Sequence, residues 1–293
     1  MLVGLLTLVN PAQAEDTWDK IMPVGAVVEQ VATGFGFTEG PIWLRSGKLI
    51  FSDIPGDAIH ELDKGKTTVF RKPSHNANGN NLDPRGRLIT CEHGSRTVTR
   101  TLPGNKIETI ASHFEGKRLN SPNDVVVARN GDIYFTDPPY GIRKDQQELD
   151  FNGVYRLRGD KLEVIARDFV RPNGIGLSND GSKLYVSDTQ GRHIRRFDIA
   201  KDGSITGGEV WVQVTGDKPG QPDGLRLDLR GNVYCTGSGG VHVFTPSGKK
   251  LGVIETPEVP TNCAWGDADG SALYITAQKS VYRIKLNARG LRY

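Results

Sequence analysis

The feature of this sequence that most constrains its fold is a repeat of about 40–50 residues, the usual length of one β-propeller blade. Each copy places a turn glycine before a short segment rich in β-branched and aromatic residues. These segments read SGKLIFSD, RGRLITCE, NGDIYFTD, DGSKLYVSD, RGNVYCTG and DGSALYITA, and their turn glycines are Gly47, Gly86, Gly131, Gly181, Gly231 and Gly270. The six copies predict six structural units of one kind.

Each copy also holds enough short segments for four strands. A second alternating segment follows the first, as in AIHELD or GVYRLR, and a third often comes next, as in TTVFRK. An apolar segment such as PIWL or VVVA precedes each glycine. No stretch shows the period of about 3.6 residues that marks an amphipathic helix. The sequence therefore predicts an all-β fold over residues 37–293: a six-bladed β-propeller with four-stranded blades around a central channel.

The N-terminal residues have a different pattern. Residues 1–14, MLVGLLTLVNPAQA, are uncharged, contain an apolar run from Leu2 to Val9 and end in a small-x-small triplet. This pattern predicts a signal peptide cleaved after Ala14, and therefore a periplasmic or secreted protein. The run is shorter than the roughly 20 residues that span a bilayer, so no membrane association is expected after cleavage. Within residues 15–36, the stretch VGAVVEQVATGF is expected to supply the strand that closes the last blade.

Charge and cysteine content argue against two classes of protein. The 37 Lys and Arg residues and 34 Asp and Glu residues are evenly spread and give a net charge of +3. The sequence therefore lacks the concentration of positive charge that is typical of nucleic-acid-binding proteins. Cys91, Cys235 and Cys263 lack the spacing of zinc ligands and allow at most one disulfide. We expect them to be small buried strand residues, and whether two of them pair stays open.

An oxygen-bearing side chain lies eight positions before every turn glycine. In a propeller the first strand of each blade lines the channel, so equivalent positions of all blades converge on one axis. Asn-Gly and Asp-Gly pairs are also common in turns. The polar residue occupies the same position in every repeat, however, and this favours a binding site over a set of unrelated turns. The expected ring consists of Glu39, Asn78, Asn123, Asn173, Asp223 and Asn262.

The donor atoms of this ring indicate what it would bind. Carboxylate and amide oxygens suit hard cations, so Ca²⁺ is the expected cofactor, with Mg²⁺, Mn²⁺, Zn²⁺ or Fe²⁺ as alternatives. Coordination positions left open to water and substrate would make the site catalytic. Competing motifs are weak: the stretch 237–240 lacks the GxSxG spacing of a nucleophilic serine, and the stretch 267–270 lacks the first acidic ligand of a calcium loop.

Several longer motifs resemble one family. They are FTEGPIW (37–43), RLNSPNDVVV (118–127), YFTDPPYG (134–141), RPNGIGLSNDG (171–181) and QPDGLRLD (221–228). Together they resemble the senescence marker protein/gluconolactonase/luciferin-regenerating enzyme family, above all its bacterial gluconolactonases, from about residue 37 to residue 286. The resemblance implies that Glu39, Asn173 and Asp223 hold the metal and that Asn123 contacts either metal or substrate. Asn78 and Asn262 are then expected to line the channel.

The same resemblance implies an activity. The expected reaction is the metal-dependent opening of a sugar lactone, D-glucono-1,5-lactone to gluconate, with Asp223 as general base and Asn123 orienting the substrate. Arg118, Asn120 and Tyr140 lie on loops at the same end of the channel and are expected to contact the substrate.

Several alternatives stay open. His93, beside the predicted ring, would contact the substrate or make only a structural hydrogen bond. The same site could act on another lactone or an organophosphate ester, since one fold hosts many chemistries. The chain could also be a non-catalytic, calcium-stabilised propeller that serves as a binding module. The oligomeric state is left open.

Overall fold

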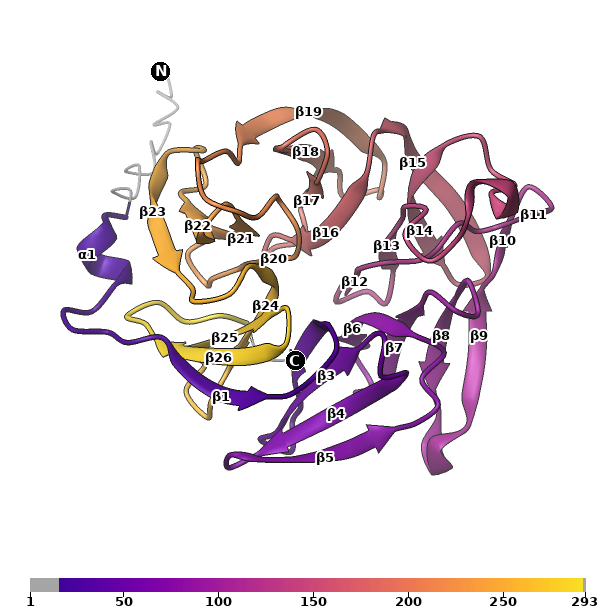
Figure 1. Cartoon of the computed structure of the whole chain (residues 1–293). Coiled ribbons are helices and arrows are strands. Elements are labelled where there is room, and N and C mark those ends of the chain that lie inside the picture. Colours follow the sequence, from indigo (N-terminus) through magenta and orange to yellow (C-terminus); the bar gives the residue numbers. More distant parts are fainter. Residues whose placement is uncertain (1–15, 292–293) are drawn as a thin grey trace, which may run out of the picture.

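The computed structural model describes residues 16–291, and the predicted signal peptide lies outside them. The described residues form six four-stranded antiparallel sheets, arranged around a common centre as the blades of a propeller (Figure 1). The predicted fold class is therefore confirmed. A short helix, α1 (Trp18–Ile21), precedes the first strand. No helix among residues 16–291 has both the length and the apolar character that a membrane span needs.

Each blade is built from strands that follow one another in the sequence. The first two blades contain β2 (Thr38–Trp43), β3 (Leu49–Asp53), β4 (Ala58–Asp63) and β5 (Lys66–Arg71), then β6 (Ala77–Leu82), β7 (Leu88–Glu92), β8 (Thr97–Thr101) and β9 (Ile107–Ala111). The third and fourth contain β12 (Val125–Val127), β13 (Ile133–Asp137), β14 (Asn152–Arg158) and β15 (Lys161–Phe169), then β16 (Pro172–Leu177), β17 (Lys183–Asp188), β18 (His193–Ile199) and β19 (Ile205–Gln213). The fifth contains β20 (Leu225–Leu227), β21 (Val233–Gly237), β22 (Gly240–Phe244) and β23 (Lys250–Glu255).

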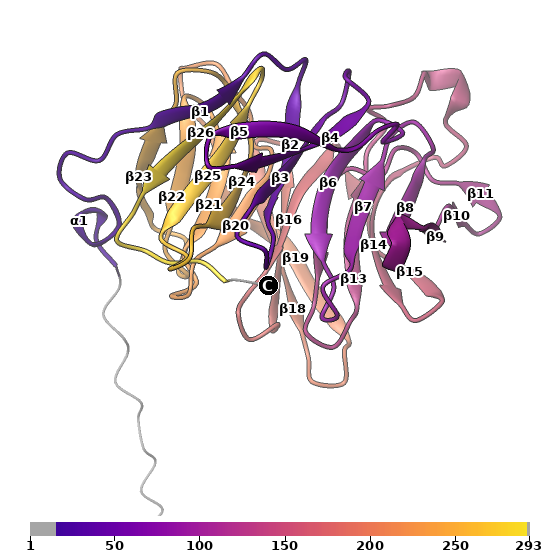
Figure 2. The ribbon, with the colours of Figure 1, turned by 90° about the horizontal axis from the view of Figure 1, so that it is seen from below.

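The sixth blade joins the two ends of the described chain. Its inner strands are β24 (Pro260–Gly266), β25 (Ala272–Ala277) and β26 (Ser280–Lys285), and its outer strand is β1 (Glu29–Thr33). β1 pairs antiparallel with β26, and Figure 2 shows it running along the outside of that blade. This pairing joins the N-terminal strand to the last blade and so closes the ring of blades. A small hairpin, β10 (His113–Phe114) with β11 (Lys117–Arg118), lies between the second and third blades in the sequence.

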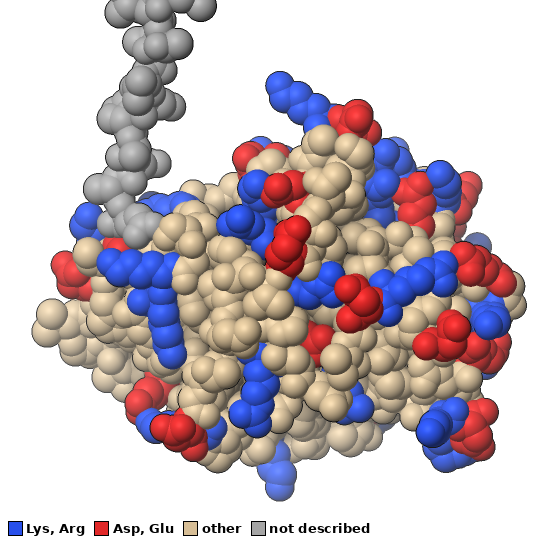
Figure 3. Space-filling model, turned by 90° about the horizontal axis from the view of Figure 1, so that it is seen from above, with Lys and Arg blue, Asp and Glu red and all other residues tan. Residues whose placement is uncertain are grey.

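The apolar core lies between the blades. Every pair of neighbouring blades shares a cluster of buried apolar side chains, as the period-2 pattern of each strand requires. In β3, for example, Leu49 and Phe51 pack toward the sixth blade whereas Ile50 packs toward the second. Cys91, Cys235 and Cys263 are free and buried in three of these clusters, as expected for small strand residues. On the surface, Lys and Arg side chains intermix with Asp and Glu over the face seen in Figure 3.

Carboxylates at the ends of second strands hold the segments that lead into the channel. The carboxylate of Asp137, at the end of β13, accepts the backbone N–H groups of Asn120 and Ser121, both at 2.7 Å. Asp53 and Asp188 make the same kind of contact in the first and fourth blades. These contacts fix the backbone that carries each first strand to the mouth of the channel.

The glycines after the ring positions allow the first strands to approach one another closely. A Cβ atom on Gly40 would lie 2.0 Å from the carbonyl oxygen of Asn78, and one on Gly174 would lie 2.2 Å from that of Asp223. Both distances are far below a van der Waals contact. The glycines after the ring residues therefore do more than form turns, because they let neighbouring blades pack closely around the axis.

We predict that Gly174→Ala destabilises the protein by about 1–3 kcal/mol, because the new methyl group must push the fourth and fifth blades apart. Thermal or urea unfolding monitored by circular dichroism measures this change. A stability equal to that of the wild type would mean that the blades tolerate a wider separation, contrary to the close contact described here.

Candidate functional site

The structure brings the six predicted ring side chains together at one end of the channel. The amide of Asn78 donates to Oδ1 of Asn123 at 2.7 Å, and the amide of Asn123 donates to Oδ1 of Asn173 at 2.6 Å. Nδ2 of Asn262 donates to Oε2 of Glu39 at 3.1 Å. These side chains, 45 to 223 residues apart in the sequence, therefore touch across blade boundaries.

Backbone contacts between blades hold the ring in register. A hydroxyl group on the second strand of one blade donates to the carbonyl oxygen of the ring residue in the next blade. The bonds are Ser52 Oγ to Asn78, Thr136 Oγ1 to Asn173 and Ser187 Oγ to Asp223, each at 2.7 Å. Hydrogen bonds from the second strands of neighbouring blades thus hold the backbone of the channel mouth.

Two carboxylates of the ring are close enough to repel each other. Burial raises the pKa of Glu39 to about 7, with a further contribution from the carboxylate of Asp124, although the N–H of Gly40 at 2.8 Å stabilises the charged form. Burial and then the charge of Glu39 raise the pKa of Asp223 well above its usual range, and a hydrogen bond from Asn173 opposes this rise. A nearby positive charge would stabilise both carboxylates.

The donor atoms fit a hard divalent cation. Oδ1 of Asn78 is buried and has no hydrogen-bond partner among the described residues, so it can still accept one. Residues 16–291 contain no group of three or more His, Cys, Asp and Glu side chains that could hold a metal ion, so any cation here would rely on amide oxygens beside Glu39 and Asp223. Such an all-oxygen donor set suits Ca²⁺ better than Zn²⁺ or Fe²⁺.

Two predicted contact residues, His93 and Tyr140, lie beside the ring. Nε2 of His93 is 3.2 Å from Oδ1 of Asn123, and burial lowers the pKa of His93 to about 4, so its imidazole is neutral near pH 7. The hydroxyl of Tyr140 lies 3.3 Å from Nδ2 of Asn173. Burial raises the pKa of Tyr140 to about 12, so the hydroxyl keeps its proton, while the residue is 38% exposed. Tyr140 can therefore meet both solvent and the ring.

The other two predicted contact residues, Arg118 and Asn120, differ in exposure and in hydrogen-bond partners. Arg118 is exposed on β11 and its guanidinium donates to the carbonyl oxygen of Ser95 at 3.0 Å. Asn120 is fully buried, and its Nδ2 donates to the carbonyl oxygens of Asp137 and Phe151 at 3.1 and 2.9 Å. The Nδ2 group of Asn120 therefore ties two segments together, while its Oδ1 is buried and has no hydrogen-bond partner among the described residues.

Sequence reasoning did not single out three polar residues that contact this site. Oγ1 of Thr189 accepts from Asn173 at 2.9 Å, and the amide of Asn262 lies 3.3 Å from Oδ2 of Asp124, which pairs with Arg226. Thr189 directly follows an acidic residue at the end of β17, just as His93 does after β7, so the repeat itself carried this signal. Asp124 and Arg226 could have been noticed as charged residues within or beside apolar first-strand segments.

A separate groove lies at the opposite ends of the strands. It has a volume of about 760 Å³ and is lined by the turns around Asp83, Asn130, Gly181 and Asp202. None of the predicted site residues borders it. The mouth with the polar ring and this groove are therefore separate features of the two faces of the propeller.

Comparison with known proteins gives relatives that span nearly the whole chain. The family described as the SMP-30/Gluconolactonase/LRE-like region matches residues 37–279. A gluconolactonase of Zymomonas mobilis is 33% identical and the match covers 98% of this chain and 88% of that protein. The structure of a gluconolactonase from Xanthomonas campestris is similar with a TM-score of 0.84 and 33% identity, covering 95% of this chain and 99% of the other.

A more distant solved structure shares the fold. It is the calcium-binding protein regucalcin of Agrobacterium tumefaciens, with a TM-score of 0.77 and 20% identity, covering 91% of this chain and 96% of the other.

Proposed function

Because this chain belongs to the SMP-30/gluconolactonase/LRE-like family, we propose that it hydrolyses a sugar lactone such as D-glucono-1,5-lactone to the aldonic acid. The observation that carries the proposal is the ring at the channel mouth, in which Glu39, Asn173 and Asp223 come from three blades. The gluconolactonases of Zymomonas mobilis and Xanthomonas campestris support the choice of substrate.

The proposed cofactor is Ca²⁺, held by Glu39, Asn173 and Asp223, with Asn123 as a further ligand or a substrate contact. When bound, such an ion supplies Lewis-acid polarisation of the lactone carbonyl. The calcium-binding relative from Agrobacterium tumefaciens supports the choice of ion. Asn262 would line the channel, where its amide donates to Oε2 of Glu39 at 3.1 Å.

The chain's own side chains account for the remaining steps. Asp223 is the only partly exposed member of the ring, so its carboxylate can take a proton from the water that attacks the lactone carbonyl. The amide of Asn123 and the neutral hydroxyl of Tyr140, which both contact Asn173, would hold the sugar hydroxyls. The water adds to the carbonyl carbon as Asp223 takes its proton, which gives a tetrahedral adduct. The bond between that carbon and the ring oxygen then breaks, and the ring oxygen takes the proton from Asp223 to become the hydroxyl group of the aldonic acid.

The experiment that tests this proposal combines metal analysis with a substrate panel. The purified protein should contain a divalent ion, and in a pH-stat it should release acid from D-glucono-1,5-lactone faster than the spontaneous reaction. A chelator should abolish this difference and Ca²⁺ should restore it. Turnover of aliphatic lactones or phosphotriesters in place of sugar lactones would contradict the proposed substrate. No turnover at all by the metal-loaded protein would favour a binding module.

Replacement of His93 tests its contact with Asn123. In His93→Phe the amide oxygen of Asn123 loses one of two partners and keeps the hydrogen bond from Asn78, so the loss is about 0.5–1.5 kcal/mol and we expect kcat/KM for the lactone to fall by up to about tenfold. His93→Gln keeps a hydrogen-bonding group and should retain more of the activity than the phenylalanine variant. Equal kinetics for the wild type and both variants would show that His93 has no part in the reaction.

We also propose that the protein is exported, on the basis of the pattern in residues 1–14. Cell fractionation of a tagged full-length chain should place the processed protein outside the cytoplasm, with Glu15 as its new N-terminus. An uncleaved chain in the cytoplasm would contradict this proposal.

A further inference from the structure

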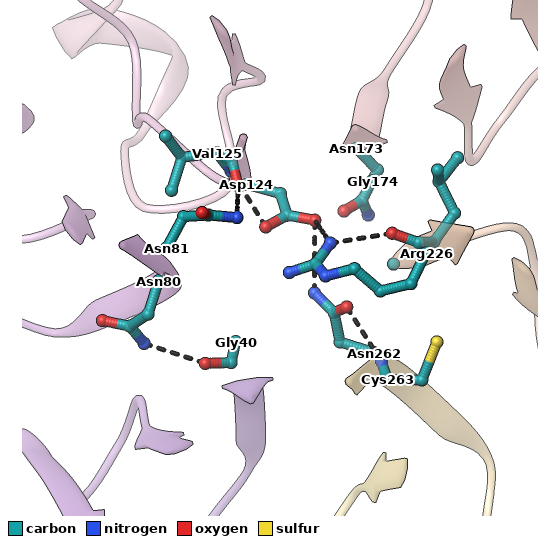
Figure 4. Close-up of polar contacts among 12 residues, drawn as sticks. Gly40, Asn80, Asn81, Asp124, Val125, Asn173, Gly174, Arg226, Asn262 and Cys263 are labelled. Carbon is teal, nitrogen blue, oxygen red and sulfur yellow. Dashed lines mark hydrogen bonds and ion pairs between the residues drawn. The ribbon is translucent and has the colours of Figure 1, made fainter. Parts of the chain in front are cut away.

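A buried ion pair lies directly beside the ring. Nη1 of Arg226, on β20, is 3.4 Å from Oδ2 of Asp124, and the two side chains are only 7% and 1% exposed. Asp124 directly follows the ring residue Asn123, and Arg226 comes three residues after Asp223. Figure 4 shows the carboxylate and the guanidinium reaching toward each other from different blades. A full positive charge is therefore held within the channel.

One amide connects this ion pair to the ring. Nδ2 of Asn262 lies 3.1 Å from Oε2 of Glu39 and 3.3 Å from Oδ2 of Asp124. The carboxylates of Glu39 and Asp124 thus share one donor. A change of charge at Asp124 or Arg226 must be felt at Glu39.

The surroundings strengthen this coupling. Arg226 borders a cavity of about 30 Å³ whose other walls include Ile42, Trp265 and Leu291, so little water can screen its charge. Coulomb interactions are several-fold stronger in such surroundings than in bulk water. The charge of Asp124 raises the pKa of both Glu39 and Asp223, and Arg226 opposes this for Glu39. The ring and the ion pair are therefore one electrostatic unit.

The formal charges of this unit balance a divalent ion. Glu39, Asp124 and Asp223 carry one negative charge each and Arg226 carries one positive charge, which leaves two negative charges. Building on the cation site proposed above, we propose that Arg226 is a specificity-determining residue: its charge matches the site to a divalent ion and disfavours a trivalent one. The alternative is that the pair merely braces two blades.

A selectivity role for Arg226 and a purely structural role for the ion pair predict different metal affinities in variants. If the charge of Arg226 matters, Arg226→Met leaves the site one charge more negative and favours a trivalent ion, whereas Asp124→Asn does the reverse. The double variant removes both charges and restores the original balance. If the pair is only a brace, each single variant loosens the ring and weakens both ions alike.

The experiment is calorimetric titration of the full chain, freed of metal by a chelator, with Ca²⁺ and separately with Tb³⁺. We expect Arg226→Met to raise the ratio of Tb³⁺ to Ca²⁺ affinity by about tenfold or more, and Asp124→Asn to lower it by a similar factor. The double variant and Arg226→Lys should keep the wild-type ratio. Lys249→Met, which removes a positive charge from an exposed turn of the same blade, is the matched control and should change nothing.

The possible outcomes distinguish a failure of the proposed role of Arg226 from a failure of the proposed cation site. An unchanged ratio in both single variants, with binding weakened alike for the two ions, would overturn the role of Arg226 and leave the cation site standing. If Arg226→Met does not fold, Asp124→Asn and Arg226→Lys still decide the question, because only the first should lower the ratio. A wild-type chain that binds neither ion would overturn the cation site and with it this inference.

Discussion

Asp223→Asn should lower kcat for D-glucono-1,5-lactone by roughly 10²–10⁴-fold, the usual contribution of a general base. The amide has nearly the same shape as the carboxylate but cannot take a proton from water. Because Asp223 is also a proposed metal ligand, its replacement should weaken Ca²⁺ binding as well. Steady-state kinetics at saturating calcium separate the two effects.

Asp217→Asn is the matched control for this variant. Asp217 is exposed on the segment that leads into β20, six residues before Asp223, and its replacement should leave kcat unchanged. An Asp223→Asn variant that binds calcium as tightly as the wild type and hydrolyses the lactone at the same rate would contradict the proposed mechanism. It would favour the non-catalytic alternative.

Glu39→Gln should remove most of the calcium-dependent stability of the protein. A ligand at about 100 times its Kd stabilises the folded state by about 2.7 kcal/mol, which corresponds to roughly 4–5 °C in Tm for a chain of this size. The variant lacks one of two ring carboxylates, so at the same calcium concentration it should gain less than about 1 kcal/mol. Thermal unfolding with and without calcium measures both values.

The behaviour without calcium makes this test more specific. In chelator, Glu39→Gln should melt no lower than the wild type, because the repulsion of Glu39 by Asp124 and Asp223 is relieved. Glu209→Gln, on the exposed outer strand β19, should keep the full calcium response. A Glu39→Gln variant with an undiminished calcium response would exclude Glu39 as a ligand.

The fold could be predicted because a propeller repeats its signal. The turn glycine, the alternating strand after it and the polar residue eight positions before it recur in every blade, so each copy supports the interpretation of the others. The same register led to the ring, since residues such as Asn78 and Asn123 occupy equivalent positions on neighbouring blades and touch in the structure.

The remaining contacts do not keep a constant spacing from the turn glycine. Thr189 lies eight residues after Gly181 whereas His93 lies seven after Gly86, because β17 is one residue longer than β7. A search in strict register therefore misses Thr189. Asp124 and Arg226 are partners from two different blades and have no common register.

The hydrogen-bond partners of the Asn120 side chain also could not be predicted from the sequence. Asn120 and Asn123 lie in one motif, three residues apart, and both were expected at the site. The carboxylate of Asp137 anchors the backbone N–H of Asn120, and the side chain turns to the carbonyl oxygens of Asp137 and Phe151. Such a loop conformation depends on partners from another strand and follows no pattern within the motif.

The most direct test of this account is a crystal structure of the protein with calcium, with the ion identified by its anomalous scattering. We predict a single ion at the channel mouth, with side-chain oxygens of Glu39, Asn173 and Asp223 at about 2.3–2.6 Å from it. An ion bound elsewhere, or one that leaves any of these three side chains out of its coordination sphere, would contradict it.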